Sequence, residues 1–153
     1  MRRWVAISIM CLTVATAGLA QDGRLRRLDT GVDAGAWEAV GRLDIRGKGF
    51  CTGALIAPRL VLTAAHCLYD KDSKQRIDHS EVEFLAGWRN GRAGAYRNVR
   101  RAVVHPDYVY DGVVSSDRVR NDLALLELDR PIRNTTIKPF DTARRPRQGD
   151  QLG

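Results

Sequence analysis

Short apolar stretches of strand length, each closed by glycine, proline or polar residues, dominate the chain from residue 37 onward. The first of them alternates apolar and polar residues with period two, which is typical of a half-buried strand. No stretch has the pattern of an amphipathic helix. Short strands at such close spacing predict an all-β fold, an antiparallel barrel or sandwich. Six strands are expected, over residues 37–45, 50–56, 60–63, 82–87, 96–104 and 123–128.

Composition is that of a globular protein, with 44% hydrophobic and 28% charged residues among 153. This length corresponds to one domain with a real core and excludes wholesale disorder. The net charge of +7 is spread along the sequence. Binding to nucleic acid would need a concentrated basic face with stacking aromatic residues or a recognition helix, and the sequence shows neither. We therefore expect no nucleic-acid partner.

The first twenty residues have the three parts of a secretory signal peptide. Arg2 and Arg3 precede an apolar segment over residues 4–17, and the small-x-small cleavage motif is at residues 18–20. The apolar segment is too short for a comfortable membrane span. We expect a secreted or periplasmic protein without a stable membrane anchor after signal cleavage. Residues 21–35 are polar and predict a flexible leader or propeptide.

Cleavage of the signal peptide leaves two cysteines, Cys51 and Cys67. In an exported protein, two cysteines most simply form one disulfide. The bridge would close a loop of about 15 residues and contribute on the order of 3 kcal/mol in the chain-entropy estimate.

His66 follows a short apolar strand and two small residues, Ala64 and Ala65. The small residues leave room around the imidazole, so His66 is either a reactive base or a packed core histidine. A zinc site would combine His66 with Cys51, Cys67 and either His79 or His105. These residues lack the paired short ligand spacings of structural zinc sites. We expect neither a metal nor another cofactor.

Three stretches, taken in order, closely resemble the first half of the trypsin-like (chymotrypsin-fold) serine proteases. They are Cys51-Thr52-Gly53-Ala54-Leu55-Ile56 leading to Leu62-Thr63-Ala64-Ala65-His66-Cys67, then Val104-His105-Pro106-Asp107-Tyr108, then Asn121-Asp122-Leu123-Ala124-Leu125-Leu126-Glu127-Leu128. The resemblance covers roughly residues 37–139. It implies a six-stranded antiparallel β-barrel over residues 36–140, the first of the two barrels of that fold. Residues 141–153 would then be the linker between barrels.

The resemblance implies a role for each of two residues. His66 matches the family's general base, and Asp122 matches the carboxylate that orients it. Asp122 also fits on physical grounds, because a carboxylate at the start of an apolar strand would be partly desolvated and would need a hydrogen-bonding partner. His105 matches a structural position in a His-Pro turn.

The serine nucleophile of the family has no counterpart in this sequence. The serines after the signal peptide all precede Asp122 and none lies in a Gly-Asp-Ser-Gly-Gly segment: Ser73, Ser80, Ser115 and Ser116. We expect the N-terminal portion of a serine endopeptidase that acts on protein or peptide substrates. It would be truncated before its second barrel, inactive alone, and normally packed against that missing barrel. The alternative is a protease-like binding or regulatory module without catalysis.

Overall fold

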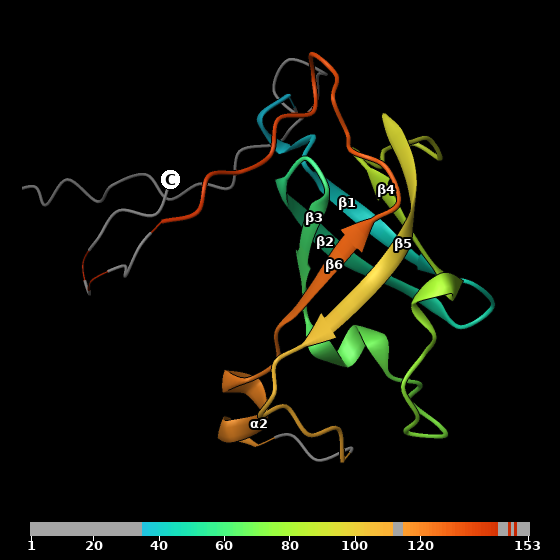
Figure 1. The fold of residues 1–153 in the computed structure, drawn as a ribbon, viewed down its shortest axis with the longest axis vertical. Coiled ribbons are helices and arrows are strands. Elements are labelled where there is room, and N and C mark those ends of the chain that lie inside the picture. The colour runs from blue at the N-terminus through green and yellow to red at the C-terminus, as the bar shows by residue number, and fades with distance from the viewer. Residues whose placement is uncertain (1–34, 112–114, 144–146, 148, 150–153) are drawn as a thin grey trace, which may run out of the picture.

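The computed structural model describes residues 35–111, 115–143, 147 and 149 (Figure 1). The predicted signal peptide and nearly all of the predicted leader lie outside these residues. Six strands form within the described ranges, at the expected places: β1 (Val40–Ile45), β2 (Gly49–Ala57), β3 (Leu60–Thr63), β4 (Val82–Ala86), β5 (Ala95–Val104) and β6 (Ala124–Leu128). Single turns of 3-10 helix accompany them: η1 (Gly35–Trp37), η2 (Ala65–Leu68) and η3 (His79–Glu81).

The strands close into one antiparallel barrel in the order β1-β2-β3-β6-β5-β4, which confirms the predicted fold class. Successive side chains of a strand point to opposite faces, so every second residue enters the interior. In β1 and β6 this alternation is regular, and Leu43, Leu126 and Leu128 are at most 1% exposed. The interior is filled by apolar side chains, of which the largest that is fully buried is Phe84.

Two glycines allow the strands to approach closely inside this barrel. A Cβ added at Gly41 would lie 2.5 Å from the carbonyl oxygen of Leu85 and 2.5 Å from the ring of Phe84. A Cβ at Gly53 would lie 2.6 Å from a methyl group of Val61. Close-packed interiors have no spare room of this size. The two glycines therefore give space to the large side chains beside them.

A short helix, α2 (Ser116–Arg120), lies where the sequence predicted a longer loop over residues 108–120. The Ser115 hydroxyl accepts a hydrogen bond from the backbone N–H of Arg118 at 3.1 Å and caps the first turn. Asp117 in the first turn and arginines in the last match the helix dipole. A helix of one turn is too short for its apolar periodicity to be visible in sequence. None of the described helices is long and apolar enough to cross a membrane.

The chain beyond β6 returns along the barrel wall. The Ile132 N–H donates to the carbonyl oxygen of Pro58 at 2.7 Å, and the Phe140 N–H donates to that of Leu55 at 2.9 Å. The ring of Phe140 also meets that of Trp37 edge to face, with centroids 6.3 Å apart. Trp37 lies in η1, so the strand expected from residue 37 starts only at Val40.

Replacing Gly41 by alanine should test how tightly the barrel interior is packed. We expect Gly41→Ala to lower the free energy of unfolding by about 1–3 kcal/mol, the usual cost of overpacking. Gly35→Ala is the matched control, because a Cβ there meets nothing within 4 Å. It should change stability by less than about 0.5 kcal/mol. Denaturant unfolding of the full-length protein measures both, and equal effects of the two variants would contradict this packing.

Candidate active site

Strand register brings two distant segments to the same end of the barrel. Ala124 at the start of β6 pairs with Thr63 at the end of β3 and with Val104 at the end of β5. His66 follows Thr63 by three residues, and Asp122 precedes Ala124 by two. The antiparallel pairing of β3 with β6 therefore places the histidine and the carboxylate side by side, although 56 residues separate them in sequence.

Asp122 binds His66 at two points. One carboxylate oxygen, Oδ2, lies 2.7 Å from the ring nitrogen Nδ1 of His66. The other, Oδ1, accepts a hydrogen bond from the backbone N–H of His66 at 2.8 Å. One carboxylate therefore fixes both the ring and the backbone that carries it. The Asp122 side chain is 21% exposed and that of His66 is 49% exposed, so the ring remains open to solvent and ligands.

The ionised form of Asp122 is favoured by these contacts. Partial burial raises the pKa of the carboxyl, but the hydrogen bonds from the ring and backbone of His66 lower it more, with help from the ring's charge and the Ala65 backbone. The net result is a pKa of Asp122 below its ordinary value of 3.8. At neutral pH, Asp122 is an anion that accepts from Nδ1–H, which selects the tautomer with an unprotonated Nε2.

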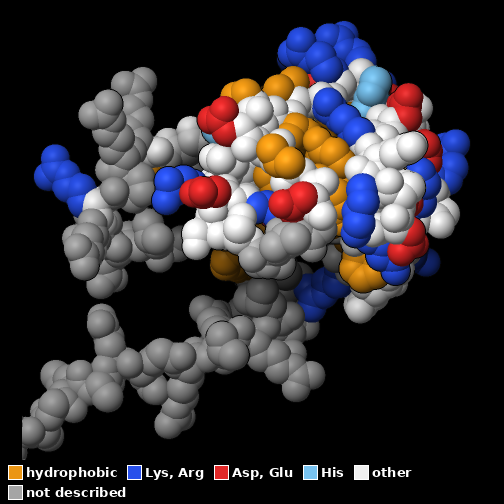
Figure 2. Space-filling view, turned by 90° about the horizontal axis from the view of Figure 1, so that it is seen from below, with side chains coloured by type: hydrophobic (Ala, Val, Ile, Leu, Met, Phe, Trp, Pro, Cys, Tyr) orange, Lys and Arg blue, Asp and Glu red, His pale blue; other side chains and the backbone are white. Residues whose placement is uncertain are grey.

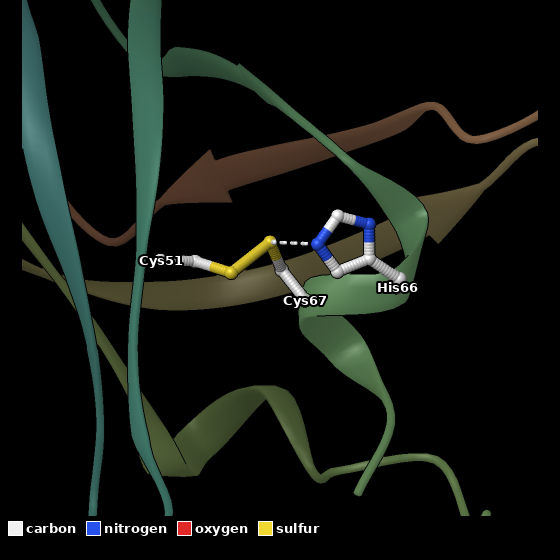
Figure 3. Close-up of side chains that lie close together, drawn as sticks. All are labelled: Cys51, His66 and Cys67. Carbon is white, nitrogen blue, oxygen red and sulfur yellow. Dashed lines mark hydrogen bonds between the residues drawn. A yellow bond between two sulfur atoms is a disulfide. The ribbon is translucent and has the colours of Figure 1, made fainter. Parts of the chain in front are cut away.

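Nε2 of His66 lies 3.7 Å from Sγ of Cys67 (Figure 3). Cys67 is joined to Cys51 in a disulfide, with Cα atoms 6.0 Å apart. A disulfide sulfur carries no hydrogen, so this contact supplies no proton to Nε2. The nitrogen keeps the lone pair that a general base requires.

The disulfide links η2, which carries His66, to strand β2 of the barrel wall. It closes a loop of about 15 residues, for which the chain-entropy estimate is about 3 kcal/mol of stabilisation. The backbone of His66 is therefore held on one side by the bridge at Cys67 and on the other by the carboxylate of Asp122.

Three of these side chains bring possible metal-ligating atoms close together. Atoms of Cys51, His66 and Cys67 lie within 4.8 Å of one another. Metal ions bind cysteine as a free thiolate. Because both sulfurs are committed to the disulfide, the group offers only the imidazole and does not fit a metal.

A cleft of about 560 Å³ opens beside His66 and the disulfide. Its wall includes Tyr69 and Tyr110, whose rings stack with centroids 5.0 Å apart and planes 13° from parallel. Tyr108, which is 6% exposed, lies against Tyr69, and the Arg118 guanidinium lies 4.7 Å from the Tyr110 ring centroid. The sequence did not identify these residues as part of the site. The only signal was the position of two tyrosines just after the His-Pro turn.

This end of the barrel is shown in Figure 2, where apolar side chains gather near the middle of the face with basic and acidic groups around them. The other histidines lie apart from the cleft. His105 forms a turn, because its Nδ1 accepts from the Asp107 N–H at 3.3 Å and its carbonyl accepts from the Tyr108 N–H at 3.0 Å. His79 lies in η3 beside Asp78, with 3.7 Å between Nδ1 and Oδ1.

The described serines are engaged elsewhere and none hydrogen-bonds to His66. The Ser73 hydroxyl donates to Asp70 at 3.0 Å. Ser80 lies in η3, whereas Ser115 and Ser116 cap and begin α2. The geometry therefore pairs an imidazole with a carboxylate, and no described serine hydroxyl hydrogen-bonds to that imidazole.

The comparison with known proteins identifies relatives along most of the chain. Residues 30–152 match the sequence profile of the family described as Trypsin. Trypsin epsilon of Drosophila erecta is 29% identical over 153 residues, covering 91% of this chain and 56% of that protein. The suppressor of tumorigenicity 14 protein homolog of Bos taurus is 32% identical over 118 residues, 71% of this chain and 13% of that protein. The chain thus spans about half or less of the length of these relatives.

Two solved structures share the fold. The VesB protease of Vibrio cholerae superposes with a TM-score of 0.51 at 25% identity, over 65% of this chain and 29% of that one. A Glu endopeptidase superposes with a TM-score of 0.50 at 24% identity, over 61% of this chain and 40% of that one.

The lowered pKa of Asp122 predicts a specific acid sensitivity. A carboxyl whose pKa is lower in the folded than in the unfolded state stabilises the fold at any pH above its unfolded-state pKa, here near 3.8. That stabilisation is lost as the pH falls toward the folded-state pKa. Below about pH 4, the free energy of unfolding should therefore fall more steeply with acid in the wild type than in Asp122→Asn. Denaturant unfolding at a series of pH values measures this.

Asp72→Asn is the control for charge, since it removes a carboxylate from an exposed loop. It should keep the wild-type pH dependence. Identical acid sensitivity in the wild type and Asp122→Asn would show that the two hydrogen bonds to His66 do not stabilise the ionised carboxylate.

Proposed function

Because the chain belongs to the trypsin family of serine proteases, we propose that it forms the base-and-carboxylate part of the active site of a serine endopeptidase. His66 is the general base and Asp122 the carboxylate that orients it. The main support for the proposal is that Asp122 makes two hydrogen bonds to His66. Its Oδ2 lies 2.7 Å from Nδ1 of the ring, and its Oδ1 lies 2.8 Å from the backbone nitrogen of the same histidine.

The proposed chemistry follows from this geometry. A serine hydroxyl is a weak nucleophile until a base removes its proton during attack on the peptide carbonyl. Nε2 of His66 takes that proton and later returns it to the leaving amine. Asp122 keeps the ring in the right tautomer and stabilises the imidazolium that forms in between; the trypsin family is the reference case for this arrangement. The His66 side chain is half-exposed and lines the cleft, which is consistent with this role.

We propose that the nucleophile is supplied by protein outside these 153 residues. No described serine hydrogen-bonds to His66, and no serine follows Ser116 in the sequence. Val119 and Leu123 flank Asp122 in the sequence, and their side chains are 62% and 44% exposed. Apolar surface beside an active site marks an interaction surface. A second barrel that brings the serine would cover these two side chains.

The disulfide supports an exported enzyme. Disulfides form and persist in oxidising compartments and are rare in the cytosol. The bridge at Cys67 lies next to His66, so its presence matters at the site itself. We propose a secreted or periplasmic endopeptidase that acts on protein substrates.

A fluorophosphonate probe, which reacts with activated serines, tests this function directly. The protein expressed from its full coding sequence should be labelled on a serine outside residues 1–153. Asp122→Asn should slow labelling by about 10⁴-fold, the loss known for the reference case of the family. His66→Ala should slow it by a comparable factor, because without the base the serine keeps its proton.

His79→Ala is the matched control, since His79 lies in η3 away from the cleft, and it should label at the wild-type rate. The 153-residue chain alone should remain unlabelled. Absence of labelling in the native full-length protein would overturn the peptidase proposal and leave the non-catalytic binding module.

A further inference from the structure

A cation lies close to two aromatic rings on the outer face of the barrel. Arg42 is in the middle of β1, which is flanked by β2 and β4. Its guanidinium carbon lies 4.3 Å from the ring centroid of Phe50 on β2 and 5.5 Å from that of Trp88, which follows β4. Phe50 is 67% exposed and Trp88 is 38% exposed. Two aromatic rings therefore lie within cation–π distance of one guanidinium at the protein surface.

The guanidinium has few polar partners within the protein. Its Nε is buried and has no hydrogen-bond partner among the described residues. Nη2 makes one long hydrogen bond to Asp44 on the same strand, at 3.5 Å, and the closest approach of the ion pair is 3.4 Å. Asp44 is 45% exposed, so water competes for its charge. In the described part of the chain, Asp44 is the single carboxylate paired with Arg42.

This environment favours a second carboxylate. The Arg42 side chain is only 28% exposed, and this partial removal from water strengthens a charged hydrogen bond formed by its guanidinium. The planar fork of arginine also matches the two oxygens of a carboxylate, which a lysine ammonium does not. A pocket of about 310 Å³ beside Arg42 provides the room.

The pocket adjoins the cleft at His66. Phe50 and Cys51 line both cavities. Cys51 is bonded to Cys67, the neighbour of His66, and the residue after Cys51 pairs with Arg42 across β1 and β2. A peptide that lies in the cleft and crosses the Phe50 ring therefore reaches Arg42. The cleft itself holds Lys48 and Lys71 together with acids, so it provides no net charge preference of its own.

We propose that Arg42, Phe50 and Trp88 form a subsite that binds an acidic side chain of a peptide substrate beside the His66 cleft. The proposal rests on the peptidase function proposed above, because the cleft is taken as the place where the substrate lies. Arg42 is a specificity-determining residue in this account. It recognises one charged position of the substrate and takes no part in proton transfer.

Binding can be measured apart from cleavage. The full-length protein carrying His66→Ala, which prevents turnover, is titrated by calorimetry with acetylated alanine-rich hexapeptide amides. Each peptide carries one glutamate, scanned along its length, and has a partner with glutamine in its place. At one position glutamate should bind about tenfold more tightly than glutamine, equivalent to about 1.4 kcal/mol. The ratio should fall toward one in Arg42→Gln.

Two further variants separate charge from geometry. Arg46→Gln removes the same charge from the exposed β1–β2 turn, outside the pocket, and should keep the tenfold ratio. Arg42→Lys keeps the charge but loses the fork, and should retain only part of the preference. A preference that survives Arg42→Gln, or is lost equally in Arg46→Gln, would overturn the subsite.

Failure of the subsite and failure of the enzyme give different results. If the peptides bind with the predicted ratio but the active full-length protein cleaves none of them, the subsite is supported and the peptidase function is contradicted. If the protein cleaves peptides without any glutamate preference, only the subsite is contradicted and the peptidase function is supported. Absence of any difference in binding, as would follow if a carboxylate of the remaining polypeptide occupied Arg42, also overturns the subsite.

Discussion

One carboxylate, that of Asp122, holds both the ring and the backbone of His66, and the candidate site depends on this contact. The two residues come from segments that meet only because β3 and β6 pair in one register. A shift of one residue in that pairing would turn the side chains to the opposite face. The closed barrel leaves no free sheet edge among its six strands, and it therefore fixes the distance between the His66 imidazole and the Asp122 carboxylate.

The second constraint on the site is covalent. The bridge between Cys51 and Cys67 attaches η2 to the barrel wall and places an aprotic sulfur beside Nε2 of His66. Asp122 and the disulfide act on different parts of the same segment. The carboxylate selects the tautomer, and the bridge limits how far the segment moves. Together they orient a half-exposed histidine with little support from burial, because 49% of its side chain is accessible.

The strands were predictable because each alternates or closes at a turn residue, and the barrel followed from the resemblance of three motifs to a known family. The short helix α2 was not predictable, since one turn leaves no periodic pattern. The stacked rings of Tyr69 and Tyr110 and the placement of Arg42 close to Phe50 and Trp88 were missed for a different reason. They depend on which strands and loops are neighbours in space, and local sequence does not contain that information.

Nitrogen-15 NMR of the imidazole in the full-length protein measures whether Asp122 selects the Nδ1–H tautomer of His66 and leaves Nε2 free to accept a proton. At a pH where the ring is neutral, we predict a protonated Nδ1 and an unprotonated Nε2. In Asp122→Asn the two tautomers should become mixed or reversed. A wild-type ring protonated at Nε2, or the same tautomer ratio with and without the carboxylate, would show that Asp122 does not select the tautomer.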